Sequence, residues 1–193
     1  HKGISFFLMP ITSPGIKVMP LQSMPGYVTF CQEYFEDVRV PARNLVGEQN
    51  QGWYIGAALL DFERSGIGGA TGVKRGLDRL VAFVRERRRS GQELSTTLRR
   101  RIVDRYVEAD VARSFSYRIA SLQAAGRAPN YEASMGKVFG SELGTRVAET
   151  GFSVLKMYGQ LRENELRAQM DGRYSLALMM SIIGNIGGGT SEI

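Results

Sequence analysis

Residues 60–64, with the sequence LDFER, lie near the start of a long helical pattern that runs from about residue 53 to residue 88. The positions that share one face of the predicted helix are Leu59, Leu60, Glu63, Ile67 and Ala70, at i, i+1, i+4, i+8 and i+11. At 3.6 residues per turn they form an apolar face about 100° wide, and Glu63 lies at its centre. The pattern therefore predicts a helix whose buried face carries one carboxylate.

Glu63 is the first candidate for a catalytic residue. Burial on an apolar face raises the pKa of a carboxyl group because it disfavours the charged form, and a carboxylate with a raised pKa is a better proton acceptor. This is the profile of a general base. The alternative is structural, because Arg64 or a charge on a partner helix would neutralise Glu63. Periodicity alone leaves both interpretations open.

Three further helical patterns follow, separated by turn signals. Ser90 and Gly91 end the first helix. The second helix is expected over residues 96–125, the third from an Asn130 cap to residue 155, and a shorter fourth over residues 165–183. Four helices joined by short connections predict an antiparallel bundle.

Residues 3–47 have the pattern of β-structure. A buried strand is expected at residues 4–8, an extended segment begins at Gly15, and the aromatic-rich run 27–35 continues the β pattern. Residues 38–41 lead out of the sheet, and residues 44–47 form a turn. Fewer than 50 residues with so many aromatics would leave a sheet edge and one face uncovered, so this region is expected to be the end of a larger β domain.

Composition narrows the classes of function. The 193 residues are enough for one domain, or one and a half, with a real core. No apolar run reaches the roughly 18 residues of a membrane-spanning helix, so no membrane insertion is expected. The only cysteine, Cys31, cannot form an internal disulfide, which favours a reducing, cytoplasmic location. A single His and a single Cys argue against a His/Cys metal site and a His-based catalytic triad.

The formal charge of +6 is concentrated around one predicted turn. The arginines on its two sides are Arg85, Arg87, Arg88 and Arg89 before it, and Arg99, Arg100 and Arg101 after it. A nucleic acid, a small polyanion or an acidic partner protein would suit such a turn. No aromatic residues alternate with these arginines, which weakens a model of single-strand stacking. The alternative is a solvated, arginine-rich helix end.

Two groups of glycines indicate close approach of another group. Gly66, Gly68 and Gly69 follow Glu63 within a predicted helix, where each costs about 1 kcal/mol relative to Ala. A tightly packed helix, or a flat cofactor or bulky substrate, would explain them equally well. The chain ends in residues 185–193, NIGGGTSEI, where a glycine turn followed by hydroxyl residues is typical of a helix that begins over an anionic ligand.

The closing residues 189–193, GTSEI, together with the rest of the chain, resemble the acyl-CoA dehydrogenase family. Residues 35–41 and 44–47 resemble the passage from the middle β domain of that family into its C-terminal helical bundle. The resemblance implies a mainly α fold. Residues 1–47 would be the last strands of a β-barrel-like middle domain, incomplete here, and residues 48–193 a C-terminal four-helix bundle that is truncated at its C-terminus.

The resemblance implies FAD-dependent α,β-dehydrogenation of an acyl-CoA thioester, with electrons passing to an electron-transfer flavoprotein. In many members a carboxylate directly before the Gly-Thr-Ser motif removes the α-proton, but Gly188 occupies that position here. In the isovaleryl and long-chain members the base lies on the first bundle helix, directly before an arginine. Glu63 matches that position, so the resemblance and the apolar-face pattern select the same residue.

The resemblance also implies ligand-binding residues. Asp61 and Arg64 match positions that contact the CoA substrate, and Gly189 matches the glycine beside the thioester. Thr190, Ser191 and Glu192 match the segment that meets FAD. Arg87 matches an arginine that reaches the FAD pyrophosphate of a neighbouring subunit. The resemblance thus implies a homo- or hetero-oligomer, either a dimer or a tetramer. Arg89 and Ser90, which lie beside Arg87, depart from the family pattern.

Gly188 would leave room for a bulky substrate, as in a bacterial subgroup that acts on steroid-CoA thioesters and assembles from two related chains. A second hypothesis is therefore a non-catalytic partner subunit that completes the flavin site of its neighbour. The strands that flank the flavin are expected upstream of His1, so these residues alone are expected to bind FAD poorly and to be inactive.

Overall fold

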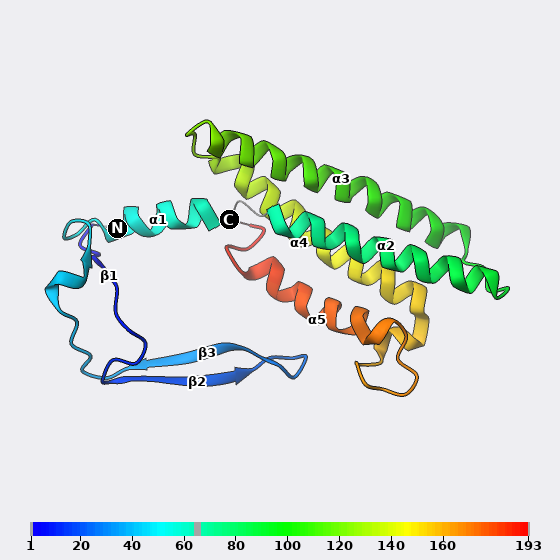
Figure 1. The fold of residues 1–193 in the computed structure, drawn as a ribbon, viewed down its shortest axis with the longest axis horizontal. Coiled ribbons are helices and arrows are strands. Elements are labelled where there is room, and N and C mark those ends of the chain that lie inside the picture. Colours follow the sequence, from blue (N-terminus) through cyan, green and yellow to red (C-terminus); the bar gives the residue numbers. More distant parts are fainter. Residues whose placement is uncertain (1, 64–66, 193) are drawn as a thin grey trace. The chain divides into compact units, whose positions relative to one another are not determined.

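A computed structural model describes the backbone of residues 2–63 and 67–192, and the side chains within these ranges except those of residues 61–70. The chain forms two compact units, His1–Phe62 and Glu63–Ile193. Figure 1 gives the order of their helices and strands. None of the described helices is long and apolar enough to cross a membrane.

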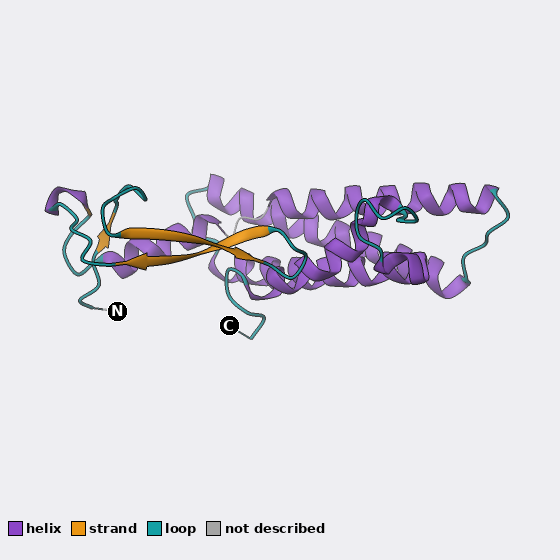
Figure 2. Cartoon of the chain, turned by 90° about the horizontal axis from the view of Figure 1, so that it is seen from below, coloured by secondary structure: helices purple, strands orange, loops and turns teal. Residues whose placement is uncertain are grey.

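The second unit is an antiparallel bundle of four helices, as the periodicity predicts. Its members are α2 (Ile67–Arg89), α3 (Thr96–Ala124), α4 (Asn130–Leu155) and α5 (Arg173–Ile186). Successive helices run in opposite directions, and α4 packs against the other three (Figures 1 and 2). The largest fully buried side chains are Leu77 and Leu80 of α2 and Leu143 and Leu155 of α4. Leu77 and Leu143 belong to one buried cluster of the bundle, and Leu80 and Leu155 belong to a second.

The predicted start of α3 is confirmed, because the Ser95 hydroxyl caps the helix by accepting a hydrogen bond from the backbone N–H of Leu98 at 3.3 Å. The predicted Asn130 cap of α4 is wrong. Asn130 is the first helical residue, and Pro129 before it is the N-cap and provides no side-chain hydrogen bond.

The predicted start of the fourth helix is also wrong, because α5 begins at Arg173 rather than at residue 165. The backbone of Met170, Asp171 and Gly172 has φ values of 53°, 57° and 62°, which cannot continue a right-handed helix. Two 3₁₀ turns, Lys156–Gln160 and Met170–Gly172, lie between α4 and α5. A Cβ atom at Gly172 would lie 2.3 Å from the backbone nitrogen of Glu163, so the connecting loop folds back closely on this glycine.

The helical pattern over residues 53–88 corresponds to two helices, α1 (Gly52–Glu63) in the first unit and α2 in the second. Residues 64–66 between them lie outside the described residues, so the predicted continuity stays a prediction. Leu59 and Leu60, two positions of the predicted apolar face, are 61% and 43% exposed. The prediction that this face is buried is wrong for these two residues, because the first unit has no second α-helix in its described part to cover them.

The first unit also contains two separate two-stranded antiparallel sheets among its described residues. Strand β1 (Phe6–Phe7) pairs with β4 (Leu45–Val46), and β2 (Ile16–Gln22) pairs with β3 (Val28–Phe35), with an irregularity at Leu21 and Gln22. A 3₁₀ turn, Ala42–Asn44, precedes β4. A barrel-like arrangement is not seen among these strands.

The β pattern of residues 27–35 is confirmed by β3, which is exposed along its whole length. The prediction of a buried strand at residues 4–8 is wrong, because only Phe6 and Phe7 are in a strand and Phe7 and Leu8 are 44% and 63% exposed. A two-stranded sheet has no second layer to cover its faces, so apolar strand residues remain in contact with solvent.

Candidate functional site

The residues Gly187–Glu192 form a turn at the C-terminal end of α5. Gly188 and Gly189 have φ values of 71° and 106°, in the left-handed region that glycine adopts without strain. Thr190 and Ser191 are half-buried and Glu192 is exposed. The triple glycine therefore ends α5, and the predicted helix start over a ligand stays a prediction.

Two side chains of α4 contact this end of α5. The Nζ atom of Lys137 donates hydrogen bonds to the backbone oxygens of Asn185, at 3.2 Å, and of Gly189. The Asn185 amide donates to Thr145 Oγ1 at 2.9 Å. The Asn185 Oδ1 atom is buried and has no hydrogen-bond partner in the described part of the chain, so a bound donor would satisfy it. Neither Lys137 nor Asn185 carries a sequence signal that predicts these contacts.

Glu192 is an anionic group of this turn. Its pKa is lowered, mainly by a hydrogen bond from the Thr190 side chain, and further by a backbone hydrogen bond and the positive charge of Lys137. A carboxylate with a lowered pKa is a weaker proton acceptor than an ordinary one. Glu192 is therefore suited to remain ionised and poorly suited to replace the base that is missing at Gly188.

Arg87 lies near the opposite end of the bundle, close to the C-terminus of α2 (Figure 1). Its Nε atom donates to Gln92 Oε1 at 2.6 Å and its Nη1 atom donates to Gln169 Oε1 at 3.0 Å. The guanidinium carbon also lies 5.4 Å from the centre of the Phe83 ring. Arg87 is thus held by neutral groups, and the structure does not bring it together with Thr190, Ser191 and Glu192.

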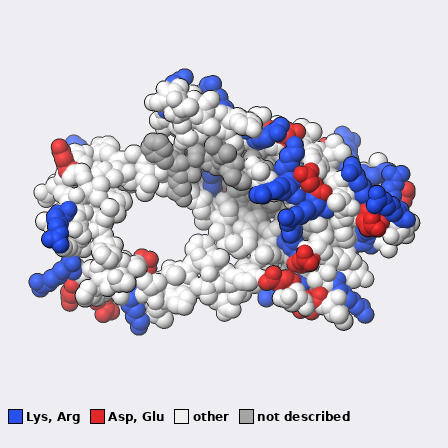
Figure 3. Space-filling model, in the orientation of Figure 1, with Lys and Arg blue, Asp and Glu red and all other residues white. Residues whose placement is uncertain are grey.

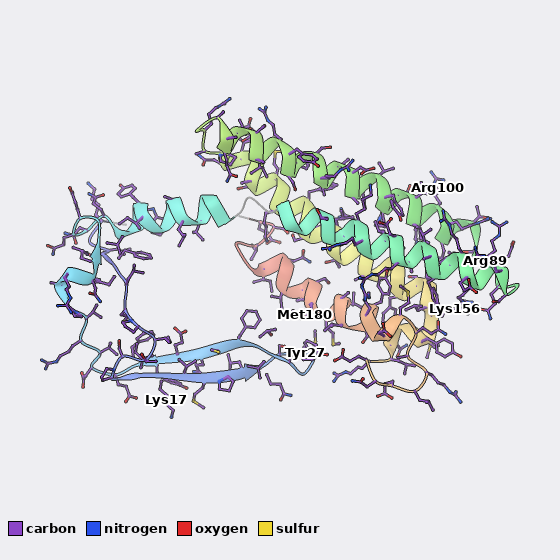
Figure 4. The ribbon with its side chains drawn as sticks, viewed as in Figure 1. Lys17, Tyr27, Arg89, Arg100, Lys156 and Met180 are labelled. Carbon is purple, nitrogen blue, oxygen red and sulfur yellow. The ribbon has the colours of Figure 1, made fainter. Side chains whose placement is uncertain are left out.

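A hollow of about 240 Å³ lies beside Arg87. Its lining combines polar and apolar side chains: Val84, Arg87, Gln92, Glu93, Leu94, Val154, Leu155, Lys156 and Tyr158. Lys156 has a φ of 56°, which is uncommon for a residue with a side chain and concentrates at functional sites. Figure 4 shows Lys156 at the same end of the bundle as Arg89 and Arg100. The hollow has two cationic residues and one carboxylate.

Most of the arginines on either side of the turn between α2 and α3 are exposed. Arg89 pairs with Glu86 at 3.1 Å, and Arg88 pairs with Glu93 at 3.8 Å. Figure 3 shows acidic side chains among the basic ones on this part of the bundle. Exposed ion pairs of this kind favour the interpretation of a solvated helix end.

The other predicted site residues are described only in part. Glu63 is the last residue of α1 and Asp61 lies two residues before it, but their side chains are not among those described. Arg64 and Gly66 lie outside the described residues altogether. The roles predicted for Asp61, Glu63 and Arg64 therefore stay predictions.

The comparisons with known proteins identify the class of this bundle. The family model "Acyl-CoA dehydrogenase, C-terminal domain" matches residues 50–193. Two solved structures share the fold. The Tcur3481-Tcur3483 steroid ACAD has a TM-score of 0.89 and 26% identity, over 100% of this chain and 49% of that chain. The ChsE4-ChsE5 complex from Mycobacterium tuberculosis has a TM-score of 0.83 and 31% identity, over 98% of this chain and 49% of that one.

Curated relatives agree with this class. Cyclohexane-1-carbonyl-CoA dehydrogenase of Geobacter metallireducens is 33% identical over 169 residues, which is 84% of this chain and 44% of that protein. Acyl-CoA dehydrogenase FadE26 of Mycobacterium tuberculosis is 31% identical over 207 residues, 100% of this chain and 50% of that protein. The chain belongs to the acyl-CoA dehydrogenase family, whose members are FAD-dependent flavoproteins. It spans about half the length of the curated relatives it matches.

Proposed function

We propose that the protein containing this chain catalyses the α,β-dehydrogenation of an acyl-CoA thioester and that Glu63 is the base. The observation that carries the proposal is the turn after α5, where the family position of the base is Gly188 and no side chain is present. The lowered pKa of Glu192 makes that neighbouring carboxylate a poor substitute. The base must then come from elsewhere, and Glu63 is the acidic residue that the sequence pattern selects.

In this proposal each site residue has its own role in the reaction. The Glu63 carboxylate accepts the proton of the α-carbon, Asp61 and Arg64 orient the CoA thioester, and the backbone at Gly189 lies beside the thioester. Thr190, Ser191 and Glu192 contribute to binding FAD, together with Arg87 at the FAD of a neighbouring subunit. FAD held by these residues would supply the acceptor for the β-hydrogen, which would leave as hydride while Glu63 takes the α-proton and a Cα=Cβ double bond forms. The electrons would then pass to an electron-transfer flavoprotein.

The hollow beside Arg87 fits one part of FAD. A diphosphate needs cationic N–H donors, which Arg87 and Lys156 offer, and the adenosine part of FAD needs an apolar surface, which Val84, Leu94 and Val154 offer. Because Gln92 and Gln169 are neutral acceptors, they orient the Arg87 guanidinium without neutralising it. These donors fit the diphosphate of the group that the family binds, and Glu93, which pairs with Arg88 at 3.8 Å, is the one carboxylate of the lining.

The substrate class that we propose is a bulky acyl-CoA, of which a steroid side-chain thioester is one example. A Cβ atom added at Gly188 would meet no other atom within 4 Å, so this position offers open space to a ligand. Relatives named for a steroid or for a cyclohexane-1-carbonyl group agree with this choice. We further propose that residues 1–47 end a middle β domain, that residues 48–193 form the helical domain, and that the protein is cytoplasmic in a bacterium.

Replacement of Glu63 tests the proposal in the whole protein. The variant Glu63→Gln keeps the size of the side chain and removes the base, so turnover should fall by a factor of about 10² to 10⁴ with FAD still bound. The matched control is Glu165→Gln, at an exposed loop residue, which should keep full turnover. Unchanged turnover of Glu63→Gln with intact FAD would reject the assignment.

A second candidate function is a non-catalytic partner subunit that completes a neighbour's flavin site. Two of the similar solved structures, Tcur3481-Tcur3483 and ChsE4-ChsE5, are named for two proteins, and Arg87 lies away from the turn that carries Thr190 and Ser191. This function predicts a colourless protein after purification alone and a yellow complex after co-expression with a related chain. A yellow and active protein made from one type of chain would reject it.

A further inference from the structure

Lys137 lies on α4 and directs its ammonium group at the turn that follows α5. Its Nζ atom bonds to the backbone oxygens of Asn185 and Gly189, which are four residues apart on the two sides of Gly187 and Gly188. We propose that Lys137 is a positioning residue for the dehydrogenation: it holds this turn in the shape in which Gly188 and Gly189 meet the thioester. This inference rests on the proposed function.

The contacts of Lys137 are directed at the turn and at no acidic side chain. In the part of the chain that the structure describes, no carboxylate lies within the 4.0 Å that defines an ion pair with its Nζ atom. The residue is half-buried, and its Nζ atom contacts two backbone carbonyl groups, while the Glu192 carboxylate interacts with it electrostatically from a longer distance. Such carbonyl groups at the C-terminus of a helix carry partial negative charge, which suits a cation.

The turn requires such an anchor because of its sequence. Gly188 and Gly189 have positive φ values, and glycine has more accessible backbone conformations than any other residue. The backbone N–H of Gly187 bonds to Ile183 at 2.8 Å, which fixes the start of the turn. Lys137 fixes the carbonyl group of Gly189 and thereby the orientation of the peptide that joins it to Thr190.

A second contact from the same helix supports this role. Thr145 lies eight residues after Lys137 on α4, so both are on one face of that helix. The Thr145 hydroxyl accepts a hydrogen bond from the Asn185 side chain at 2.9 Å. One rigid helix thus holds both the last turn of α5 and the glycine turn after it, as a positioned catalytic loop requires.

The test compares Lys137→Met with Lys74→Met in the whole protein. Lys74 makes a surface ion pair with Asp110 at 3.4 Å, and such exposed pairs contribute little to stability. Lys74→Met is thus the same chemical change at a site that should affect neither the glycine turn nor kcat. Hydrogen–deuterium exchange should become faster in residues 185–192 of Lys137→Met and remain unchanged in Lys74→Met. The value of kcat should fall by about 10- to 100-fold, with a smaller change in KM, because misplacement of reacting groups lowers the rate of the chemical step.

Lys137→Arg keeps the positive charge and N–H donors. Compared with Lys137→Met, it should therefore have a higher kcat and a slower exchange of the turn. If Lys137→Met does not fold, Lys137→Arg is compared with the wild type instead. Unchanged hydrogen–deuterium exchange in both Lys137→Met and Lys137→Arg would overturn the inference. Faster exchange of the turn in Lys137→Met with unchanged kcat would also overturn it. If the wild-type protein has no dehydrogenase activity, the proposed function fails and the positioning role fails with it. The exchange experiment would then show separately whether Lys137 holds the turn.

Discussion

Each end of the helical bundle has a cationic side chain that donates hydrogen bonds to neutral oxygen atoms, but the two side chains differ in what they leave free for a ligand. At the end of α5, Lys137 bonds to two backbone carbonyl oxygens of its own chain. At the end of α2, Arg87 bonds to the amide oxygens of Gln92 and Gln169 and lines a hollow of about 240 Å³. We infer that Lys137 stabilises the conformation of the glycine turn and that Arg87 is oriented to bind a ligand.

The geometry of the donors explains this difference. A lysine has three N–H donors, and Lys137 directs bonds at two points of one turn. An arginine has five N–H donors in a planar fork, and the two glutamines use two of those of Arg87. The other donors can bind a ligand, and the guanidinium group keeps its single positive charge because both glutamines are neutral. Lys137 and Arg87 each carry one positive charge, but Lys137 stabilises a backbone conformation whereas Arg87 provides donors for a ligand.

The largest effect that separates the two ends is expected for Arg87→Ala, which should weaken FAD binding by about 10- to 100-fold, because hydrogen bonds to charged groups contribute about 1.5–3 kcal/mol. The measurement is the FAD dissociation constant of the whole protein, in its oligomeric state. The matched control is Arg88→Ala, since Arg88 is exposed and pairs only weakly with Glu93 at 3.8 Å. Equal FAD affinity for the two variants would show that Arg87 has no special role.

A smaller effect is expected for Gln169→Leu, which should weaken FAD binding by about threefold to tenfold. This variant removes one hydrogen bond of about 1 kcal/mol that orients the guanidinium of Arg87 but leaves its charge in place. The companion variant Gln169→Glu keeps an acceptor at the same place and neutralises the charge, so it should weaken FAD binding more than Gln169→Leu. The opposite order of these two variants would contradict the view that the neutral glutamine preserves the charge.

The smallest effect is expected for the carboxylate of the glycine turn. Because the folded protein lowers the pKa of Glu192, its ionised form favours folding at pH values above the ordinary value of 4.5, and this contribution is lost as the pH falls below that value. The melting temperature of Glu192→Gln should therefore be slightly below that of the wild type at pH 7, and this difference should shrink as the pH falls below 4.5. A difference that grows as the pH falls would contradict the hydrogen bond from Thr190.

Much of the bundle could be predicted from the sequence because helices leave local signals. Leucines such as Leu77 and Leu80 repeat at helical spacing, and Ser95 marks the start of α3. The sequence before α5 is predicted to be helical because residues 165–172 contain no Pro, but Met170 and Asp171 have positive φ values. The Asp171-Gly172 pair is a turn signal that helical periodicity does not include, and the loop approaches the Gly172 backbone closely.

The contacts of the candidate site could not be predicted for a different reason. Lys137 meets Asn185 and Gly189 across 48 and 52 residues, and Arg87 meets Gln169 across 82 residues. Such pairs depend on how the helices are arranged, and a lysine in the middle of a helical pattern is ordinarily a solvated residue. The exposed apolar residues of α1 and the strands were equally unpredictable, because burial depends on neighbouring layers that local periodicity does not describe.

Glu63 is the proposed base, and the rate of flavin reduction tests this role most directly. The whole protein with bound FAD is mixed with an excess of a reactive acyl-CoA, in the absence of oxygen, and the bleaching of the yellow flavin is followed in wild type and Glu63→Gln. Bleaching should slow by a factor of about 10² to 10⁴ in the variant, while the FAD content stays the same. Equally fast bleaching in the two proteins would contradict the account.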